Sequence, residues 1–346
     1  MGLQADKKLH GSRRVSVAPM MAWTDRHCRF FLRRFSRHCL LYTEMVTSSA
    51  LLRGNPERLL GFHADEHPLA LQLGGSDPEA LAVAARFGAD YGYDEINLNV
   101  GCPSDRVRSG RFGACLMAEP GLVADCVAAM TDSVELPVTI KTRIGIDSQD
   151  SYEFLRQLLD PVTAAGCRTV IIHARKAILG GISPKQNRNI PALNYATVYR
   201  VKQDYPGLEV ILNGGVRDLP GVAAHLVAVD GVMLGREAYH NPYMLAGVDA
   251  RFYGAARLPP SRDTIVRSML PYIETELNAG TALKHITRHM LGLYQGVPGA
   301  RVWRRHLSQQ ATVDGAGIEV IREAREAVNR ITTPASPEPV SQVGHG

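Results

Sequence analysis

The chain has 346 residues, 45% of them hydrophobic and 21% charged, with a net charge of +5, which is the balance of an ordinary water-soluble folded protein. No apolar run reaches 18 residues, no signal-peptide core follows the first methionine, and the six cysteines form neither a C-x-x-C pair nor a zinc-type cluster with histidine. These features exclude a transmembrane helix and a zinc-finger fold, and they lead us to expect a cytoplasmic protein that binds no metal, contacts no membrane and folds without disulfides.

Eight short apolar runs recur over the first 250 residues, and a loop and a stretch of helical periodicity follow most of them. The runs are Val15–Met20, Leu40–Glu44, Leu69–Leu73, Glu95–Asn99, Val138–Arg143, Thr169–Ala174, Glu209–Asn213 and Gly231–Leu234. Helices are expected between them, for example at Pro78–Tyr91 behind Asp77 and at Asp218–Val227. Eight strands that alternate with helices predict an α/β fold, a (β/α)8 TIM barrel over residues 11–256, with an open doubly wound sheet as the alternative.

Each predicted strand ends in, or is followed by, polar or charged side chains, glycines or a proline, which are not typical of a hydrophobic core. They are Pro19-Met20, Glu44, Gln72, Asn97 and Asn99, Lys141 and Arg143, His173 and Arg175, Asn213-Gly214-Gly215, and Gly235-Arg236. Barrel enzymes build their active sites on this C-terminal face of the strands. The two glycine motifs follow the last two strands, where barrel loops commonly bind phosphate, although each motif alone is also typical of a tight turn. No G-x-G-x-x-G opens a helix after the first strand, so a Rossmann-type site is not expected.

Two side chains at these strand ends, Lys141 and His173, have both a structural and a functional interpretation. Lys141 lies within an apolar strand. It is either a core lysine paired with a carboxylate, for which Glu44 is the candidate, or a cation beside a cofactor that becomes negative when reduced. His173 is either a hydrogen-bonded core histidine or part of a ligand site. Arg175, two residues further on, points to the same side of the strand, which favours a shared ligand.

Cys102 follows the fourth predicted strand in the sequence Asn97-Leu98-Asn99-Val100-Gly101-Cys102-Pro103-Ser104. The flanking glycine and proline force it into a tight loop on the catalytic face, whereas most of the other cysteines are typical inert buried thiols. A thiol with an ordinary pKa of about 8.5 is mostly protonated at neutral pH, so it can serve as a general acid or as a nucleophile, and spacing does not decide between them. The following stretch, to about Pro120, has no clear helical period and several glycines. Long barrel loops of this kind are often mobile lids, and the sequence does not decide whether this one is.

A proline-rich linker, Arg257-Leu258-Pro259-Pro260, precedes a predicted all-α helical domain over residues 261–331. Its helices are expected near Ser261–Asn278, Thr281–Tyr294, Ala300–Gln310 and Ile318–Arg330. The expected N-caps are Ser261 and Thr281, and the expected terminators are Gly280 and Gly296. Pro271 should kink or split the first of these helices. Residues 1–10 and the Pro/Ser/Gly-rich residues 332–346 are predicted to be disordered.

The excess of positive charge lies in the last quarter of the sequence. Residues 251–331 hold 12 Lys and Arg against 7 Asp and Glu, whereas residues 1–250 hold 27 against 26. Arg301, Arg304 and Arg305 have i, i+3, i+4 spacing and face one way on a predicted helix, away from the neighbouring tryptophan. A solvated face is the usual explanation of such a run, but an excess confined to one region also favours a polyanionic partner.

Two further basic residues, Lys185 and Arg188, lie in the loop after the sixth predicted strand. This loop is at the same end of the barrel as the polar strand ends. Basic groups from both domains around one opening would follow a phosphate backbone.

These motifs together resemble the tRNA-dihydrouridine synthases. The resemblance runs from about Val15 to Arg305. It rests on Ala18-Pro19-Met20, Tyr42-Thr43-Glu44-Met45, Gln72-Leu73-Gly74-Gly75, the segment from Asn97 to Ser104, Lys141-Thr142-Arg143, His173-Ala174-Arg175, Asn213-Gly214-Gly215 and Gly235-Arg236. Three further segments are similar to the A subfamily in particular, namely Trp23-Thr24-Asp25-Arg26-His27, Gly145-Ile146-Asp147 and Arg288-His289-Met290-Leu291-Gly292-Leu293.

The resemblance implies a flavin-dependent oxidoreductase that uses NADPH to reduce the C5–C6 double bond of uridines 20 and 20a in the D-loop of tRNA. It implies FMN contacts from Pro19, Met20, Met21, Gln72, Lys141, His173, Asn213, Gly214, Gly215, Gly235 and Arg236. It implies Cys102 as the proton donor, Asn99 as a tRNA contact at the site, and Lys185, Arg188, Arg301 and Arg304 as a tRNA-orienting signature. The expected partner is tRNA and not DNA, and the protein is expected to be a monomer.

In this chemistry Lys141 would stabilise negative charge near N1 and the C2 carbonyl of the flavin. Hydride would pass from N5 of FMN to C6 of uracil, while Cys102 protonates C5 from the opposite face. His173 and Arg175 would bind the uracil carbonyls, and the uridine must leave its stack to reach the barrel. Two alternatives stay open. One is an FMN barrel that acts on a free pyrimidine or small enone, and the other is a tRNA-binding or folding module whose flavin is vestigial.

Overall fold

The computed structural model describes residues 9, 11–104, 107, 109–256 and 258–332. It divides into two compact units, residues 1–260 and residues 261–346. The predicted disordered ends fall outside the described residues, apart from Leu9, which is buried among interior side chains of the first unit, and Thr332, which closes the last helix. Across the described ranges, no helix is long and apolar enough to cross a membrane.

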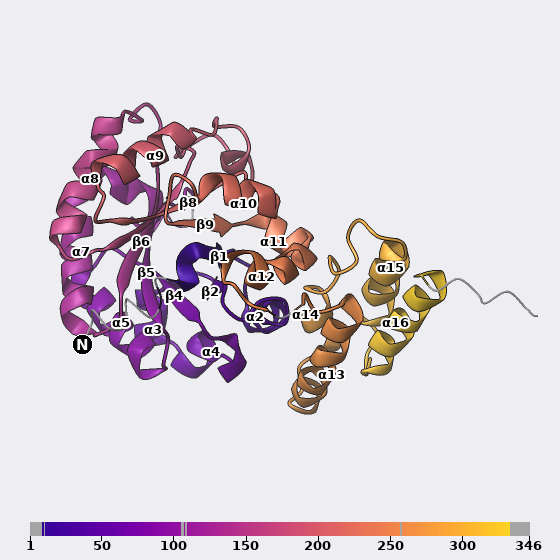
Figure 1. The fold of residues 1–346 in the computed structure, drawn as a ribbon. Coiled ribbons are helices and arrows are strands. Elements are labelled where there is room, and N and C mark those ends of the chain that lie inside the picture. Colours follow the sequence, from indigo (N-terminus) through magenta and orange to yellow (C-terminus); the bar gives the residue numbers. More distant parts are fainter. Residues whose placement is uncertain (1–8, 10, 105–106, 108, 257, 333–346) are drawn as a thin grey trace, which may run out of the picture. The chain divides into compact units, whose positions relative to one another are not determined.

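The first unit is a closed parallel β-barrel surrounded by helices, as predicted (Figure 1). Its strands are β1 (Val15–Val17), β2 (Leu40–Tyr42), β3 (Val46–Thr47), β4 (Leu69–Gly74), β5 (Glu95–Val100), β6 (Val138–Arg143), β7 (Thr169–His173), β8 (Glu209–Asn213) and β9 (Gly231–Leu234). The strands from β4 to β9 pair in chain order, β9 pairs with β1, and β1 pairs with β2. Pairing of β2 with β4 closes the ring, so the alternative of an open sheet is wrong.

The strands differ from the prediction mainly at their ends. β1 stops before Met20, because the Met20 carbonyl accepts hydrogen bonds from the backbone N–H groups of Trp23 and Thr24 and so starts a turn. The sequence pattern does not predict β3, which pairs with the C-terminal end of β4. A strand of two residues carries too little apolar periodicity to be recognised from sequence.

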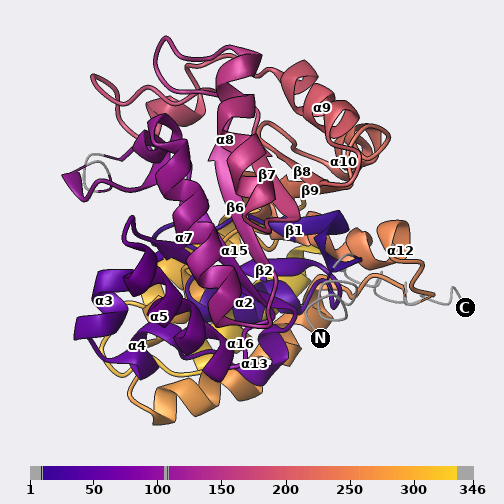
Figure 2. The same cartoon turned by 90° about the vertical axis from the view of Figure 1, so that its left-hand side faces the viewer.

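Helices cover the outside of the barrel, and α7 and α8 run along one side of it (Figure 2). The helices are α2 (Arg26–Arg33), α3 (Ser48–Arg53), α4 (Pro56–Leu60), α5 (Pro78–Asp90), α7 (Pro120–Ser133), α8 (Tyr152–Ala164), α9 (Tyr195–Asp204), α10 (Leu219–His225), α11 (Arg236–His240) and α12 (Val248–Phe252). Short 3-10 turns are η1 (Ser12–Arg14), η2 (Ala64–Glu66), η3 (Gly113–Ala118), η4 (Gln186–Arg188) and η5 (Pro242–Gly247). The predicted start of α5 is confirmed, since the Asp77 carboxylate accepts from the N–H groups of Glu79 and Ala80.

The barrel interior combines an apolar cluster with a column of polar side chains. The cluster contains Leu9, Ala18, Leu40, Tyr42, Ala70, Ile171, Ile211 and Met233, with Met20 packed against it. Along β5, Glu95, Asn97 and Asn99 occupy alternate positions, so they share one face of the strand. All three are buried and hydrogen-bond to side chains of neighbouring strands, which places the polar column inside the barrel.

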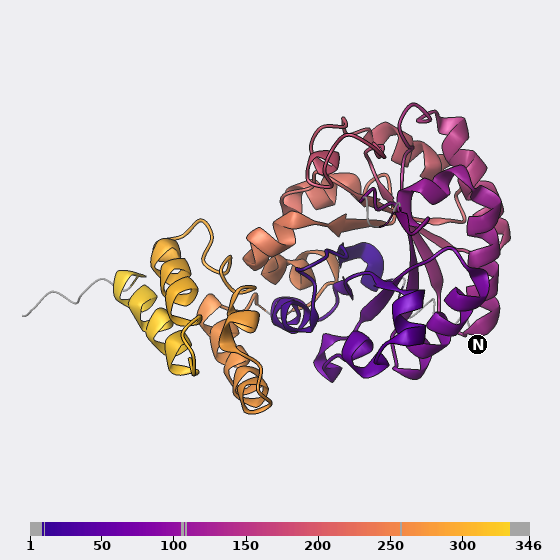
Figure 3. The same cartoon turned by 180° about the vertical axis from the view of Figure 1, so that it is seen from behind.

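The second unit is helical, with α13 (Arg262–Asn278), α14 (Leu283–Thr287), α15 (Ala300–Gln310) and α16 (Glu319–Thr332). Helices α15 and α16 pack side by side (Figure 3). Ser261 caps α13 as predicted, because its hydroxyl accepts from the Thr264 N–H at 3.1 Å. Gly280 ends this helix as predicted, with a φ of +88° and an N–H that donates to the Leu277 carbonyl.

Pro271 does not split the first helix of this unit. Helix α13 continues on both sides of it from Arg262 to Asn278, so of the two predicted outcomes, a kink or a split, the split is wrong. Met269 and Ile273, which flank the proline, are both fully buried. Their burial on the same helix offsets the backbone hydrogen bond that proline removes.

The predicted helix Thr281–Tyr294 is shortened to the five residues of α14. Thr281 is not its N-cap, because the threonine hydroxyl donates instead to the Glu276 carboxylate at 2.9 Å. Beyond α14 the chain continues in tight turns, in which the Met290 N–H bonds to the Thr287 carbonyl three residues earlier.

Candidate active site

Predicted site residues of the first unit lie at the C-terminal ends of their strands, which meet at one mouth of the barrel. Pro19, Met20 and Met21 follow β1, Gln72 lies in β4, Asn99 in β5, Lys141 in β6, His173 in β7, Asn213 in β8 before Gly214 and Gly215, and Gly235 and Arg236 follow β9. Cys102 follows β5, and Arg175, Lys185 and Arg188 follow β7. Arg301 and Arg304 lie in the second unit.

Asn99 holds the loop that carries Cys102. Its Oδ1 accepts hydrogen bonds from the backbone N–H groups of Gly101, at 3.1 Å, and of Cys102, at 2.9 Å. The Cys102 carbonyl accepts from the Ala114 N–H at 2.9 Å, and its Sγ lies 3.5 Å from the Ser104 hydroxyl. The backbone is therefore fixed on both sides of the thiol, while the side chain is partly exposed and open to a ligand.

Only part of the predicted lid is an open loop. Residues 113–118 form η3, in which Ala114, Leu116 and Met117 are buried. This half cannot lift without exposing its apolar side chains to water. The lid stays a prediction for the residues before 113, of which 105, 106 and 108 lie outside the described part of the chain.

Five cations gather around the mouth, namely Lys141, Arg143, Arg175, Arg188 and Arg236. They repel one another, because Arg143 acts on Lys141, Arg188 and Arg175 act on Arg143, and Arg236 acts on Arg175 and Arg188. Within the part of the chain that the structure describes, none of the five forms an ion pair with a carboxylate. A set of mutually repelling cations without acidic partners is a site for an anion.

This environment changes the protonation of the side chains at the mouth. Burial, and after it the Arg143 charge, lowers the pKa of Lys141 to about 7, while Cys102 acts in the opposite direction. Burial also lowers the pKa of Arg143 to about 10. Burial and the charges of Arg143 and Lys141 hold the pKa of His173 well below its usual value. His173 is therefore neutral near pH 7, whereas Lys141 gains or loses its proton there.

Glu44, the candidate partner of Lys141, is engaged elsewhere. Its carboxylate accepts a hydrogen bond from the backbone N–H of Ala22, in the loop after β1. No contact between Glu44 and Lys141 occurs among the described residues, so their interpretation as a core ion pair is wrong. The ammonium group of Lys141 remains available to a ligand.

The Gly214-Gly215 turn after β8 requires glycine for both conformation and space. The two residues have φ values of +114° and +76°. A Cβ at Gly214 would lie 2.6 Å from the His173 ring, and one at Gly215 would lie 2.5 Å from the Tyr195 hydroxyl. That hydroxyl donates to the Gly214 carbonyl at 2.9 Å, which fixes the turn. Gly235 differs, because a Cβ there would meet no atom within 4 Å, so open space lies beside its backbone.

Arg143 joins two loops of the mouth, a role that the sequence analysis misses. Its guanidinium donates to the carbonyl oxygens of Gly101 at 2.9 Å, Lys176 at 3.0 Å and Asn187 at 3.2 Å. It therefore ties the Cys102 loop to the loop after β7. The available signal was the position of Arg143 two residues after Lys141, on the same face of β6.

The loop after β7 also binds the remaining cations of the mouth. Arg175 donates to two backbone carbonyls of this loop, and Arg236 Nη2 donates to Asn189 Oδ1 at 2.7 Å. Lys185 and Arg188 are exposed at the two ends of η4. Arg188 is within electrostatic range of Cys102, so one end of this loop lies on the same side of the barrel as the thiol.

Buried ion pairs close the opposite end of the barrel, which we call its floor. The sequence does not predict these ion pairs. Arg13 Nε donates to Glu95 Oε2 and Arg13 Nη1 donates to Glu209 Oε2, both at 2.7 Å. Arg13 is 1% exposed and Glu95 is 0% exposed. The two glutamates are the first residues of β5 and β8, so a charged residue that opens an apolar strand was the signal.

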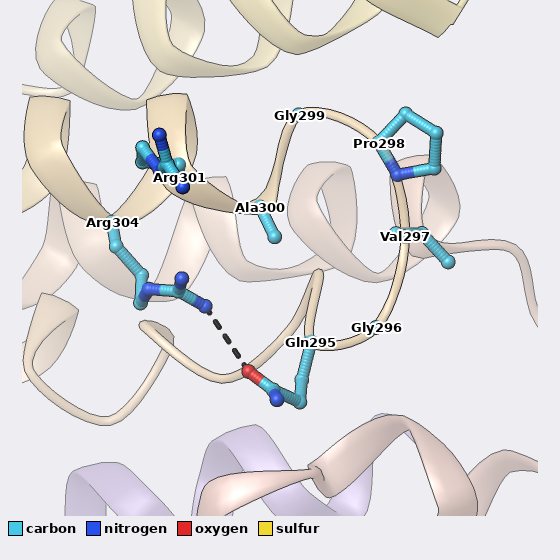
Figure 4. Close-up of a pocket in the computed structure, with 8 residues that line it drawn as sticks. All are labelled: Gln295, Gly296, Val297, Pro298, Gly299, Ala300, Arg301 and Arg304. Atoms are coloured by element: carbon cyan, nitrogen blue, oxygen red, sulfur yellow. Dashed lines mark hydrogen bonds between the residues drawn. The ribbon is translucent and has the colours of Figure 1, made fainter.

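In the second unit, Arg301 and Arg304 line a pocket together with residues 295–300 (Figure 4). Arg304 Nη1 donates to Gln295 Oε1 at 3.1 Å. Both arginines are exposed, whereas Trp303 is fully buried. The prediction that the arginines and the tryptophan lie on different sides of this helix is therefore confirmed.

Comparisons with known proteins agree with this arrangement. The family described as dihydrouridine synthase (Dus) matches residues 16–330. The chain is 59% identical over 316 residues to the tRNA-dihydrouridine(20/20a) synthase of Shewanella oneidensis, covering 91% of this chain and 94% of that protein. It is 58% identical over 321 residues to the Escherichia coli K12 protein of the same name, covering 92% and 93%. The solved structure of an old yellow enzyme homologue from Zymomonas mobilis aligns with a TM-score of 0.50 at 13% identity, covering 73% of this chain and 92% of that one, which shows a shared fold.

Proposed function

Because this chain belongs to the dihydrouridine synthase family, we propose that it reduces the C5–C6 double bond of uridine in the D-loop of tRNA, with FMN as the bound cofactor and NADPH as the reductant. The names of the Shewanella and Escherichia relatives support uridines 20 and 20a as its targets. The observation that carries the proposal is that Cys102 lies within electrostatic range of Lys141, Arg143 and Arg188, and that among the described residues none of these three cations forms an ion pair with a carboxylate. We expect the protein to act as a monomer in the cytoplasm, where tRNA matures.

The residues of the mouth fit FMN. Unpaired cations suit its phosphate, and the buried Nε of Arg175 has no hydrogen-bond partner among the described residues, which leaves a donor for a ligand. The contacts would come from Pro19, Met20, Met21, Gln72, Lys141, His173, Asn213, Gly214, Gly215, Gly235 and Arg236. When bound, FMN would supply the hydride that reaches C6 of uracil.

The protein's own side chains would handle charge and protons. Lys141 would hold a positive charge beside N1 and the C2 carbonyl of the flavin. His173 and Arg175 would donate hydrogen bonds to the uracil carbonyls, which a neutral histidine can do through one ring N–H. Cys102 would transfer its thiol proton to C5 of uracil from the face opposite the flavin and regain a proton from solvent.

The RNA contacts follow from the distribution of hydrogen-bonding and basic groups. Asn99 uses Oδ1 for the Cys102 loop and one N–H of Nδ2 for Gln72, so a second N–H remains for the uridine. Lys185, Arg188, Arg301 and Arg304 would bind phosphates and hold the tRNA while the target uridine leaves its stack.

Mass mapping of dihydrouridine tests the proposal. Unmodified tRNA is incubated with the protein, FMN and NADPH, and a gain of two hydrogens confined to uridines 20 and 20a is expected. A gain elsewhere in the D-loop would keep the reaction but reject the A-subfamily assignment. Absence of any gain, with flavin bound and NADPH consumed, would favour an oxidoreductase of free pyrimidines or small enones, which should also show no saturable binding of tRNA.

A further inference from the structure

A chain of hydrogen bonds crosses the barrel from its floor to the loop after β5. Thr139 Oγ1 donates to Glu95 Oε1 at 2.7 Å, and Asn97 Nδ2 donates to Thr139 Oγ1 at 2.8 Å. Gln72 Nε2 donates to Asn97 Oδ1 at 2.8 Å, and Asn99 Nδ2 donates to Gln72 Oε1 at 2.9 Å. We call these five residues the amide relay. It ends at Asn99 Oδ1, which accepts hydrogen bonds from the backbone N–H groups of Gly101 and Cys102 in the catalytic loop, as we call the loop after β5 that carries Cys102.

The amide relay is closed to water along its length. Glu95 and Asn97 are 0% exposed, Gln72 and Thr139 are 1% exposed, and Asn99 is 9% exposed. Buried polar groups that lose a partner in such surroundings find no replacement in solvent, so each lost hydrogen bond leaves an unsatisfied buried group and destabilises the fold. The members therefore change orientation together or not at all.

The two ends of the relay determine which group donates and which accepts in each of its hydrogen bonds. The Glu95 carboxylate, paired with Arg13, can only accept, and it accepts from the hydroxyls of Thr139 and Tyr42. At the other end the Cys102 N–H can only donate. The three amides between them must therefore point their nitrogens towards the floor and their oxygens towards the mouth. Both ends require the same direction, so the orientation of the amides is doubly determined.

We propose that Glu95 is a positioning residue for the catalytic loop. Its carboxylate fixes the direction of the amide relay, and the relay keeps Asn99 Oδ1 turned towards the backbone of Cys102. Glu95 lies at the floor of the barrel and acts only through the other members. The inference rests on the proposed function in one respect, namely that Cys102 is the proton donor.

Glu95→Gln tests the direction of the relay with almost no change in volume. The Arg13 guanidinium can only donate, so the side-chain oxygen of the new glutamine must face it. The NH₂ group of the glutamine then faces the Thr139 hydroxyl. The Thr139 proton then loses its acceptor at position 95, and within the relay it finds a new one only by donating to Asn97. That donation reverses the relay and ends with the Asn99 NH₂ group against the backbone N–H groups of the loop, whereas without it the buried hydroxyl proton stays unpaired. The opposite orientation of the glutamine would set its NH₂ group against the guanidinium, which is worse because that group is charged.

Glu209→Gln is the matched control. Glu209 accepts from the same Arg13, at 2.7 Å, and from the Thr169 hydroxyl, at 2.8 Å, so the variant also weakens the buried floor. These described partners lead no further towards the mouth. Two substitutions at Thr139 form a second pair. Thr139→Val removes the hydroxyl from the relay and Thr139→Ser keeps it, and neither changes the charge of Glu95 or Arg13.

The experiment measures two quantities on flavin-loaded protein, with thermal stability and flavin content recorded for each variant. The first is the single-turnover rate of dihydrouridine formation by pre-reduced enzyme, compared at equal flavin occupancy. The second is the rate at which iodoacetamide alkylates Cys102, followed on its peptide by mass spectrometry. Glu95→Gln and Thr139→Val should lower the turnover rate about 100-fold, the typical cost of misplacing a catalytic group by about 1 Å, and change the alkylation rate several-fold. Glu209→Gln and Thr139→Ser should stay within about threefold of the wild type.

Turnover and alkylation within about threefold of the wild type in Glu95→Gln would overturn the inference. So would equal losses in Glu95→Gln and Glu209→Gln, since general weakening of the floor would then explain both. Loss of flavin in Glu95→Gln with unchanged alkylation of Cys102 would overturn it too. The proposed function fails separately, if the wild-type protein forms no dihydrouridine in tRNA. The proton-donor assignment fails if Cys102→Ala reduces uridine at the wild-type rate, and in either case the alkylation measurement still decides whether Glu95 positions the loop that carries Cys102.

Discussion

FMN binding is expected to weaken as pH rises above 7, because Lys141 must be protonated to hold a negative ligand. Burial and the neighbouring Arg143 lower the pKa of Lys141 to about 7, against 10.5 for an ordinary lysine. The C2 carbonyl of oxidised FMN, as a hydrogen-bond acceptor, and the negative phosphate both favour the protonated lysine, which raises this pKa in the complex. A group whose pKa rises on binding contributes affinity that is complete below its pKa in the free protein. That contribution is lost as pH rises towards its pKa in the complex.

The size of the effect follows from the pKa of the free protein. Between about pH 7 and the pKa in the complex, the affinity should fall by up to about tenfold per pH unit, which is about 1.4 kcal/mol. If the complex restores an ordinary lysine pKa, the loss between pH 7 and pH 9 approaches about 100-fold. The phosphate of FMN, with a second pKa of about 6, stays dianionic over this range and does not contribute.

Titration of flavin fluorescence into flavin-free protein at several pH values measures this dependence. Lys141→Arg should bind with little change over the range, because a guanidinium keeps its proton. Lys141→Gln should bind more weakly and with a flatter pH profile. Parallel profiles for the wild type and Lys141→Gln, or an affinity that increases with pH, would refute the reasoning.

Three further predictions concern the thiol, the basic surface and the second unit. Cys102→Ala should lower dihydrouridine formation by about 10²–10⁴-fold with tRNA and flavin binding retained, since a general acid contributes that much; a normal rate by mass mapping would reject it as the proton donor. Arg301→Ala combined with Arg304→Ala should weaken tRNA binding and reduce its salt slope by about 2, while NADPH oxidation by the flavin is unchanged. Equal loss of both activities would mean that the second unit supports the barrel instead of the RNA. Trp303→Ala should destabilise the second unit by about 3–5 kcal/mol, because the indole is fully buried and donates to a backbone carbonyl. Thermal unfolding checks this against the exposed Arg305→Ala, and equal midpoints would contradict the expected loss.

The barrel could be predicted because eight strand-like runs alternate with helical stretches along the sequence. The predicted bounds of Val138–Arg143 and Glu209–Asn213 match β6 and β8, since short runs rich in β-branched residues between turn residues favour strands. The shortening of the helix predicted at Thr281–Tyr294 could not be predicted in this way. It depends on a tertiary contact, in which the Trp303 indole takes the Met290 carbonyl at 2.8 Å.

The location of the site was predictable, whereas the contacts that support it were not. Polar residues at the ends of parallel strands must meet at one mouth, so their order along the chain was enough. Glu95 carries only the signal of a charged residue that opens an apolar strand, and this does not predict burial, because a glutamate at that position normally faces water. Its partner Arg13 lies 82 positions away in the sequence. Spacing along the chain carries no information on hydrogen bonds across the barrel, and the same holds for the three carbonyls that bind Arg143.

Closure of the ring by the first and the last strand has a consequence for the synthesis of the protein. Val15 of β1 pairs with Val232 of β9, and the Tyr253 hydroxyl bonds to the backbone of Ser12 and Val15. A nascent chain therefore carries β1 with one edge unpaired until residues beyond 250 leave the ribosome, which at about 5–20 residues per second takes on the order of ten seconds or more. An unpaired strand edge is a template for pairing with another chain. The unpaired edge of β1 can therefore pair with another chain and cause aggregation while the polypeptide grows. Pairing of β1 with β9, which closes the ring, removes this edge.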